Sequence, residues 1–411
     1  MTRRQHFTII LILGTLSTIS PFSIDMYLPG FPAIASDLHT SISQVQLSLT
    51  AYLVGIAVGQ LLYGPLLDRF GRKRPLYAGL VIYLLASMGC AFATSIDALI
   101  VMRFFQALGG CVGMVAAQAL VRDLFPVGEI AQVFSLLTLV IAVSPMVAPT
   151  VGGYATVAFG WHSIFLILAI ITVLILVAIY FVLPDGRQPD SSLSLRPQAV
   201  LSSFFTVLKQ PQFLTYALVG GIATSAPFAY ISGSPDVFIN QYHISEQRYG
   251  WIFAFLAFGM IGPTQLNRFL LKRFKSEQIV YTTLIYQSVI SLLLVIGVWF
   301  DWYGPYGLIG MLFLFLAGQG LSNPNASALS LAPFTRHAGS AAALMGSFRM
   351  TFGALVSGAV SLLHNNTPIP MVGVMAVCVL MGLLILLAGQ RRIQYRRKAA
   401  TIDEPLTEAM L

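Results

Sequence analysis

Charged residues are scarce in this chain. Asp, Glu, Lys and Arg together make up 9% of its 411 residues, whereas 57% are hydrophobic, and the mean hydropathy is +0.81. A soluble globular domain carries roughly 25% charged residues. So little charge excludes a soluble globular protein, because most of the surface must face a solvent other than water. The composition indicates a protein surrounded by lipid.

Motifs of catalysis and metal binding are also missing. The three cysteines, Cys90, Cys111 and Cys378, stand singly inside apolar runs, and the six histidines fall at termini, in loops or at the ends of apolar runs. Neither residue type forms a pair with metal-ligand spacing. The sequence holds no P-loop, no His-Glu-x-x-His pair and no Gly-x-Ser-x-Gly elbow. We therefore expect no metal, no cofactor and no enzymatic activity.

Long apolar runs take the place of these motifs. Each is about 20 residues long, enough for a helix to cross a hydrocarbon core of roughly 30 Å. The expected fold is an all-α polytopic membrane protein with twelve transmembrane helices in two six-helix bundles. The predicted spans are residues 6–34, 43–66, 75–93, 98–121, 130–154, 162–183, 212–234, 248–270, 278–300, 305–327, 338–362 and 371–390.

A polar segment, residues 184–211, is rich in Pro and Ser and is much longer than the other connections. We interpret it as a linker between an N-terminal bundle (1–183) and a C-terminal bundle (212–390), with a tail at 391–411. A short surface helix is expected in the linker near residues 199–208.

Two short stretches support a division into related halves. LLDRFGRK (66–73) follows the second span and resembles LLKRFKSE (270–277), which follows the eighth. Internal repeats of this kind build many secondary transporters.

The distribution of Lys and Arg predicts an orientation. They concentrate near both ends of the chain, in the linker and in the loops after the second and eighth spans, whereas the opposite loops hold only Arg248. By the positive-inside rule, both termini and the linker are cytoplasmic. The net charge of +8 is interpreted as a topology signal and a contact with the lipid bilayer, not as a nucleic-acid site. The last residues, TIDEPLTEAML, are expected to be disordered.

The loop after the second span reads GPLLDRFGRKRP, from Gly64 to Pro75. Gly64 and Gly71 permit a close helix approach and a sharp reversal, and Asp68 can pair with an arginine. The stretch resembles the loop 2–3 signature of the major facilitator superfamily, G-x-x-x-D-R-x-G-R-K. The resemblance implies a gate that breaks and re-forms as the two halves rock, built from Gly64, Asp68, Arg69, Gly71 and Arg72.

Four further stretches carry the same resemblance. LIVMRFFQALGG (99–110) resembles the superfamily motif with an intramembrane arginine, and SPMVAPTVGG (144–153) resembles its antiporter motif. SIDMYLPGFP (23–32) and GSFRMTFGALVSG (346–358) resemble the bicyclomycin-resistance (Bcr/CflA) branch. The resemblance implies a monomeric, proton-coupled multidrug efflux antiporter of the bacterial inner membrane, which exports small amphipathic antibiotics by alternating access. The alternative is proton-coupled export of an endogenous metabolite by the same fold.

Only Asp25, Arg103 and Arg349 are charged and well inside the predicted spans. Such residues are costly in a bilayer and are functional by default. We predict that Asp25 carries the exchanged proton and competes for it with a cationic group of the substrate. The alternative is a hydrated carboxylate at the outer interface. Arg103 is expected to tune Asp25 or the backbone network beside it, or else to snorkel to the surface.

Pro21 and Pro29 flank Asp25. Each removes a backbone donor, so we expect the helix to be loosened around the carboxylate. Kinking and tight packing against the other half are expected in the fifth span, where a seal against leakage is predicted from Pro145, Pro149, Gly152 and Gly153.

Contacts to the substrate are expected from Asp25 and from seven further residues, Tyr27, Gln106, Gln118, Phe228, Tyr230, Phe253 and Arg349. Structural alternatives stay open for several of them. Gln118 is equally suited to a helix–helix hydrogen bond. Aromatic residues of the seventh and eighth spans, with Trp251 and Phe255 among them, also suit the core or a lipid-facing surface. Arg349 can snorkel, bond to backbone carbonyls or bind an anionic group.

Overall fold

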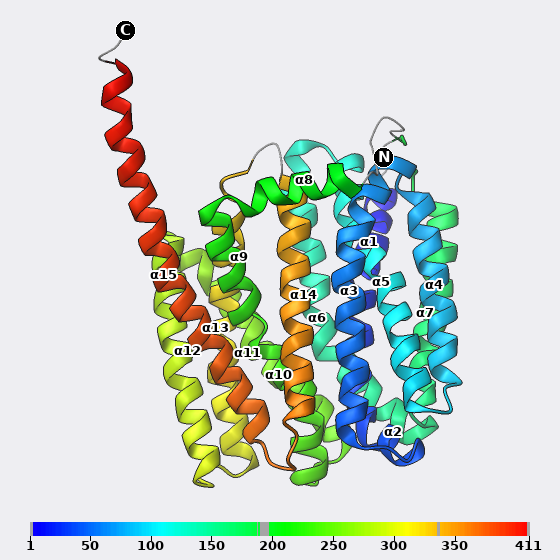
Figure 1. Ribbon diagram of the computed structural model, residues 1–411. Helices are drawn as coiled ribbons and strands as arrows, with labels where there is room; N and C mark the ends of the chain where they lie inside the picture. Colours follow the sequence, from blue (N-terminus) through cyan, green and yellow to red (C-terminus); the bar gives the residue numbers. More distant parts are fainter. Residues whose placement is uncertain (1–2, 187, 190–196, 335–337, 409–411) are drawn as a thin grey trace.

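The computed structural model describes residues 3–186, 188–189, 197–334 and 338–408, and every regular element in these ranges is helical (Figure 1). Two groups of helices lie on either side of the segment that was predicted as a linker. The N-terminal group comprises α1 (Arg3–Asp25), η1 (Leu28–Gly30), α2 (Phe31–Asp37), α3 (Ile42–Phe70), α4 (Lys73–Ala91), α5 (Ile96–Leu124), α6 (Val127–Phe159) and α7 (His162–Val182). The C-terminal group comprises α9 (Pro211–Ala223), α10 (Ala226–Pro235), η2 (Asp236–Gln241), α11 (Glu246–Leu270), α12 (Ser276–Trp299), α13 (Pro305–Leu331), α14 (Ala338–Leu362) and α15 (Ile369–Glu408).

Eleven helical segments among the described residues are long and apolar enough to cross a membrane. All eleven coincide with predicted spans. The remaining predicted span, the eighth (residues 248–270), corresponds to α11. This helix of 25 residues is long enough to cross a membrane but is less apolar than the others. Its central stretch, Tyr249 to Leu266, is free of charged residues but contains Gly, Pro, Thr and Gln among its apolar residues, and these lower its hydropathy.

The first span of each half is broken. The chain leaves α1 at Asp25, passes through the 3-10 turn η1 and continues as α2. In the second half, α9 ends at Ala223 and α10 leads into the π-helical turn η2. Pro21 and Pro29 flank the first break, as expected from residues that cannot donate a helical hydrogen bond. The helix that was expected to be loosened around Asp25 is thus interrupted just after that residue.

The two groups of helices meet along two seams, α3 against α14 and α6 against α11. Figure 1 shows α3 and α14 side by side, with α8 (Pro197–Leu208) lying across one end of the bundle. This confirms the short surface helix predicted in the linker. The end that carries α8 and the N-terminus is called the α8 end below, and the opposite end, near α2, the far end.

The C-terminal helix α15 continues beyond the bundle at the α8 end (Figure 1). The helix is described as far as Glu408, and the disorder expected for the last residues stays a prediction.

Candidate functional site

A fully buried arginine, Arg103 of α5, organises the N-terminal group of helices. Its guanidinium lies between two aromatic rings, 4.4 Å from the ring centroid of Tyr27 and 4.1 Å from that of Tyr52. It donates to Gln106 Oε1 at 2.7 Å and to the backbone oxygen of Ser23 at 3.3 Å. Cation–π contacts and charge-assisted hydrogen bonds compensate part of the cost of removing this charge from water. Arg103 therefore lies inside the bundle and does not snorkel to its surface.

Further hydrogen bonds tie this arginine to three helices. Gln106 Nε2 donates to Ser87 Oγ of α4 at 2.8 Å. The hydroxyls of Tyr27 and Ser48 are 2.7 Å apart, and the Ser23 hydroxyl is hydrogen-bonded to that of Tyr83. Gln106 and Tyr27 are thus enclosed with Arg103, so a direct contact of either with a substrate stays a prediction. The network fixes the backbone two residues before Asp25.

Asp25 is the last residue of α1 and is 5% exposed. None of the six ion pairs found in the described part of the chain includes it. The turn η1, which begins three residues after Asp25, contacts α10 and α11 of the C-terminal half. The Tyr230 hydroxyl is buried and has no hydrogen-bond partner. The carboxyl therefore lies where the two halves meet, not in a hydrated loop.

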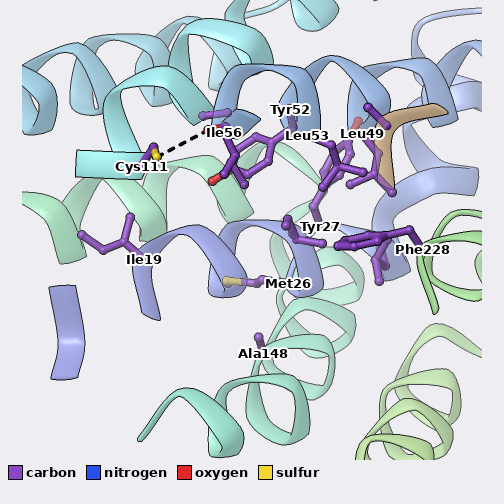
Figure 2. Packing of buried hydrophobic residues seen from close by; sticks show 14 of the residues in the cluster. Ile19, Met26, Tyr27, Leu49, Tyr52, Leu53, Ile56, Cys111, Ala148 and Phe228 are labelled. Carbon is purple, nitrogen blue, oxygen red and sulfur yellow. Dashed lines mark hydrogen bonds between the residues drawn. The ribbon is translucent and has the colours of Figure 1, made fainter. Parts of the chain in front are cut away.

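The aromatic residues of the seventh and eighth spans divide into two sets. Phe228, Tyr230 and Phe253 are buried, and the rings of Tyr230 and Phe253 stack with centroids 5.4 Å apart. Figure 2 shows Phe228 in the same packed cluster as Tyr27 of the other half. Trp251 and Phe255 are 61% and 50% exposed, as expected of lipid-facing residues. Only the buried set belongs to the cluster that contains Tyr27, two residues after Asp25.

Of the other predicted substrate contacts, Arg349 and Gln118 lie apart from this cluster. Arg349 is in the middle of α14, only partly buried, and its Nε is enclosed without a hydrogen-bond partner. Gln118 of α5 is exposed. The structure thus brings Asp25, Tyr230 and Phe253 together and leaves Gln118 outside the group.

Uncharged hydrogen bonds join the halves toward the far end. Gln46 Nε2 of α3 donates to the Ser232 backbone oxygen of α10 at 3.1 Å. The Thr50 and Ser357 hydroxyls are 3.0 Å apart, and Ser361 Oγ donates to the Ser43 backbone oxygen at 2.6 Å. Sequence reasoning missed this contact set, because single Ser, Thr and Gln residues in apolar helices carry no signal that distinguishes a seam from ordinary packing.

Glycines of α6 close the second seam. A Cβ on Gly153 would come within 2.6 Å of the Glu246 backbone oxygen of α11, and one on Gly250 within 2.7 Å of the Thr150 Cα. A Cβ on Gly152 would collide with the Met26 backbone oxygen, just beyond the α1 break. Pro145 and Pro149 lie inside α6. The expected tight packing of the fifth span against the other half is therefore present.

The loop between α3 and α4 lies at the α8 end. Arg72 donates to Asp68 Oδ1 and to Asp123 Oδ2, each at 2.6 Å. Burial alone would lower the pKa of the Arg72 guanidinium, but the hydrogen bonds to Asp123 and Asp68 raise it above its ordinary value. Gly71 adopts φ +81°, which provides the predicted reversal. Asp123 was not predicted as a partner, because 51 residues separate it from Arg72.

Two sequence expectations about this loop have different outcomes. Asp68 pairs with an arginine, as its chemistry predicted. The close helix approach expected at Gly64 is wrong, because no atom lies within 4 Å of a Cβ added there. The Arg69 guanidinium lies 6.0 Å from the Phe70 ring centroid.

Among the residues that the structure describes, no cluster of three or more His, Cys, Asp or Glu side chains could hold a metal ion. The three cysteines are buried and unpaired. The site is thus a buried carboxyl, an enclosed arginine and a set of aromatic rings between two helical halves.

Comparisons with known proteins agree with this architecture. A model of the Major Facilitator Superfamily matches residues 13–358. The chain is 31% identical over 383 residues to the bicyclomycin resistance protein homolog of Haemophilus influenzae, covering 93% of this chain and 96% of the relative. It is 30% identical over 401 residues to multidrug resistance protein D of Escherichia coli, covering 94% and 96%.

Among solved structures, a D-xylose-proton symporter superposes with a TM-score of 0.72 at 16% identity, covering 93% of this chain and 97% of the symporter. At this identity the match shows the fold alone. The family model and the two relatives do not depend on this superposition. One relative is named for bicyclomycin resistance, which is the branch that the motifs of the first and eleventh spans predicted. The chain belongs to the major facilitator superfamily, in its bicyclomycin-resistance branch, and is a multi-pass membrane transporter and not an enzyme.

Proposed function

We propose that this chain exports small amphipathic drugs across the bacterial inner membrane in exchange for protons. The α8 end and both termini face the cytoplasm, and the far end faces outward. The proton gradient supplies the energy without a cofactor, and the chain works as a monomer. Two relatives are named for resistance to bicyclomycin and to multiple drugs, which supports a drug as the transported molecule.

The observation that carries the proposal is the position of Asp25. It is a buried carboxyl with no ion-pair partner in the described residues, and it lies where the two halves meet. A carboxyl in such a site holds a proton more readily than one in water, because burial disfavours the charged form. A buried carboxyl that opens alternately to each side of the membrane can therefore carry a proton.

Exchange follows from competition for this carboxyl. With the site open to the outside, Asp25 takes up a proton. After the halves rock and the site opens to the cytoplasm, a cationic drug group approaches Asp25, favours the carboxylate and releases the proton inward. The drug then occupies the site until it opens outward again, where a new proton displaces it. The two ligands never need to touch each other.

The surrounding residues fit this cycle. Arg103 positions the backbone beside Asp25 through Ser23. Tyr230, Phe253 and Phe228 supply apolar rings for the drug body. The hydroxyl contacts between α3 and α14 and the glycine contacts between α6 and α11 can close the outer side, while the ion pairs of Arg72 hold the inner loop of the N-terminal half. These two sets of contacts are the proposed gates.

The test is drug-triggered proton release from the purified protein in weakly buffered detergent solution, comparing wild type with Asp25→Asn. We expect proton release from wild type and none from Asp25→Asn. Asp97→Asn is a matched control, because Asp97 lies in the first turn of α5 at the far end, and it is expected to release protons as wild type does. Equal release from Asp25→Asn and wild type would place the proton site elsewhere and refute the proposal.

A further inference from the structure

The second intramembrane arginine, Arg349, differs from Arg103 in having no partner. It takes part in none of the ion pairs found in the described residues, and its Nε is enclosed without a hydrogen bond. A guanidinium stays charged at any physiological pH. An unpaired charge of this kind inside a membrane span is costly. Its retention needs a reason other than the stability of this state.

Neighbouring residues on α14 show which way Arg349 faces. A Cβ on Gly346 would lie 2.6 Å from Gln60 Oε1 of α3, and one on Gly353 would lie 2.8 Å from the Phe228 ring. Positions three and four residues apart share a helix face, so Arg349 lies on the stripe between these two contacts. The stripe faces α3 of the N-terminal half at one end and the aromatic cluster at the other.

A different stripe of α14 faces lipid. Thr351, Leu355 and Gly358 border a groove of about 440 Å³ between α3 and α14, together with exposed Val54 and Val58. Arg349 does not border this groove. Snorkelling to lipid headgroups is therefore not its role, and the guanidinium is directed to the space between the two halves.

Gln60 adds a second unused polar group at the same place. Its Oε1 is buried and has no hydrogen-bond partner. The unpaired atom of Gln60 is thus an acceptor, and the donors at this place are those of the guanidinium. A guanidinium that lies between the halves without an ion pair is a site for a group that only accepts hydrogen bonds. A carboxylate is such a group and pairs with a guanidinium through two parallel bonds.

We propose that Arg349 binds a carboxylate or similar anionic group of the transported molecule. The inference rests on the proposed transport function and narrows its substrate class. Phe228 packs against Gly353, one turn from Arg349, and belongs to the same cluster as Tyr27, two residues after Asp25. The contact between the halves therefore offers a positive group, an aromatic surface and a carboxyl. The molecule that fits is a flat zwitterion, with an acidic group directed to Arg349 and an amine directed to Asp25.

The experiment uses a matched pair of probes that differ only in the acidic group. The first is a zwitterionic fluoroquinolone, an aromatic plate with an ammonium at one end and a carboxylate at the other, and the second is its methyl ester. Dissociation constants are measured by fluorescence with wild type, Arg349→Gln, Arg349→Lys and Arg268→Gln. Arg268 is the control, because it is an exposed arginine near the end of α11.

We expect Arg349→Gln to weaken binding of the acid by about tenfold or more and to change binding of the ester by less than about twofold, since only the acid makes the charge-assisted pair. Arg349→Lys should retain part of the preference for the acid, and Arg268→Gln should behave as wild type. Equal losses for acid and ester in Arg349→Gln would overturn the proposal. So would wild type that binds the ester as tightly as the acid, or that binds neither.

Thermal stability separates this role from a structural one. Removing an unpaired charge leaves no partner behind, so Arg349→Gln should melt at the wild-type temperature or above it. A clear decrease in Tm would show that the guanidinium supports the fold, and would count against a ligand site. Proton release by Asp25 is measured separately with the ester. Failure of the transport proposal and failure of the Arg349 site are therefore distinguishable.

Discussion

The broken first helix of each half is held by a polar side chain from the fourth helix of that half, but the two side chains differ in charge. In the N-terminal half, Arg103 of α5 donates to the Ser23 backbone oxygen near the end of α1. In the C-terminal half, Gln319 of α13 donates to the Ala223 backbone oxygen at the end of α9, at 3.4 Å. Each side chain is also bonded to a glutamine, Gln106 and Gln287 respectively.

This difference separates a mechanical role from an electrostatic one. A neutral amide is sufficient to hold the carbonyl at a helix break, as Gln319 does. The charge of Arg103 is therefore not required for a hydrogen bond to the backbone oxygen at the helix break. The first break carries Asp25 and the second carries no acidic residue at the corresponding turn, Ala223 to Ala226. The charge accompanies the carboxyl that is proposed to exchange protons.

Substituting Arg103 should give the largest effect. Arg103→Gln gives the N-terminal half the residue type of the C-terminal half, and we expect it to fold but to lose drug-triggered proton release. Arg103→Ala removes both hydrogen bonds and both ring contacts, and should lower the free energy of unfolding by about 3–5 kcal/mol. Stability is followed by Tm in detergent, and coupling by the proton-release assay.

The contrast between the two Arg103 variants tests the comparison itself. If Arg103→Gln releases protons as wild type does, the charge has no part in coupling, and the two halves would be mechanically and electrically equivalent. If the Tm of Arg103→Gln is as low as that of Arg103→Ala, an amide cannot replace the guanidinium even as a hydrogen-bond donor to the helix break.

Substituting the glycines that pack against the two helix breaks should reduce transport by an intermediate amount, and more at the first break than at the second. Gly152 of α6 packs against the Met26 backbone oxygen, and Gly382 of α15 packs against the Ala223 side chain. A backbone oxygen cannot move aside, so Gly152→Ala should reduce transport by about tenfold or more, whereas Gly382→Ala should reduce it a few-fold. Transport is measured as drug efflux from proteoliposomes with an imposed pH gradient.

Gly64→Ala is the matched control for both glycine variants, since the space around Gly64 is open. It should transport as wild type does, although Gly64 belongs to the loop motif. A loss with Gly64→Ala equal to that with Gly152→Ala would show that glycine content, and not the contact behind the α1 break, limits transport.

Much of the fold could be predicted from the sequence, because it depends on local signals. Apolar runs predicted all eleven segments that are long and apolar enough to cross a membrane, and also the helix α11. The prolines beside Asp25 predicted a loosened helix where the first span is interrupted. The partners at the site could not be predicted in the same way. The contact between Gln46 and Ser232 joins residues 186 positions apart, and no local pattern encodes it. Gly64 is the opposite case, where a motif glycine was expected to make a contact that the packing does not supply.

Residue type alone also failed to separate the two arginines. Arg103 and Arg349 are both single basic residues in apolar helices. Only the structure shows that Arg103 lies between two tyrosine rings and donates two hydrogen bonds, whereas Arg349 takes part in none of the ion pairs of the described residues. What distinguishes them is the set of side chains that other helices bring near, which is a property of tertiary packing.

The smallest effect is expected at the hydrogen bond between the Gln319 amide and the Ala223 backbone oxygen. Gln319→Met keeps the size of the side chain but leaves the Gln287 amide and the Ala223 carbonyl without this partner, so the free energy of unfolding should fall by about 1–2 kcal/mol. Drug-triggered proton release per mole of protein should stay at the wild-type value, because no charge near Asp25 changes. The measurements are Tm and proton release on the same preparation. A loss of proton release at unchanged Tm would mean that the C-terminal break also takes part in coupling, and the distinction drawn between the halves would fail.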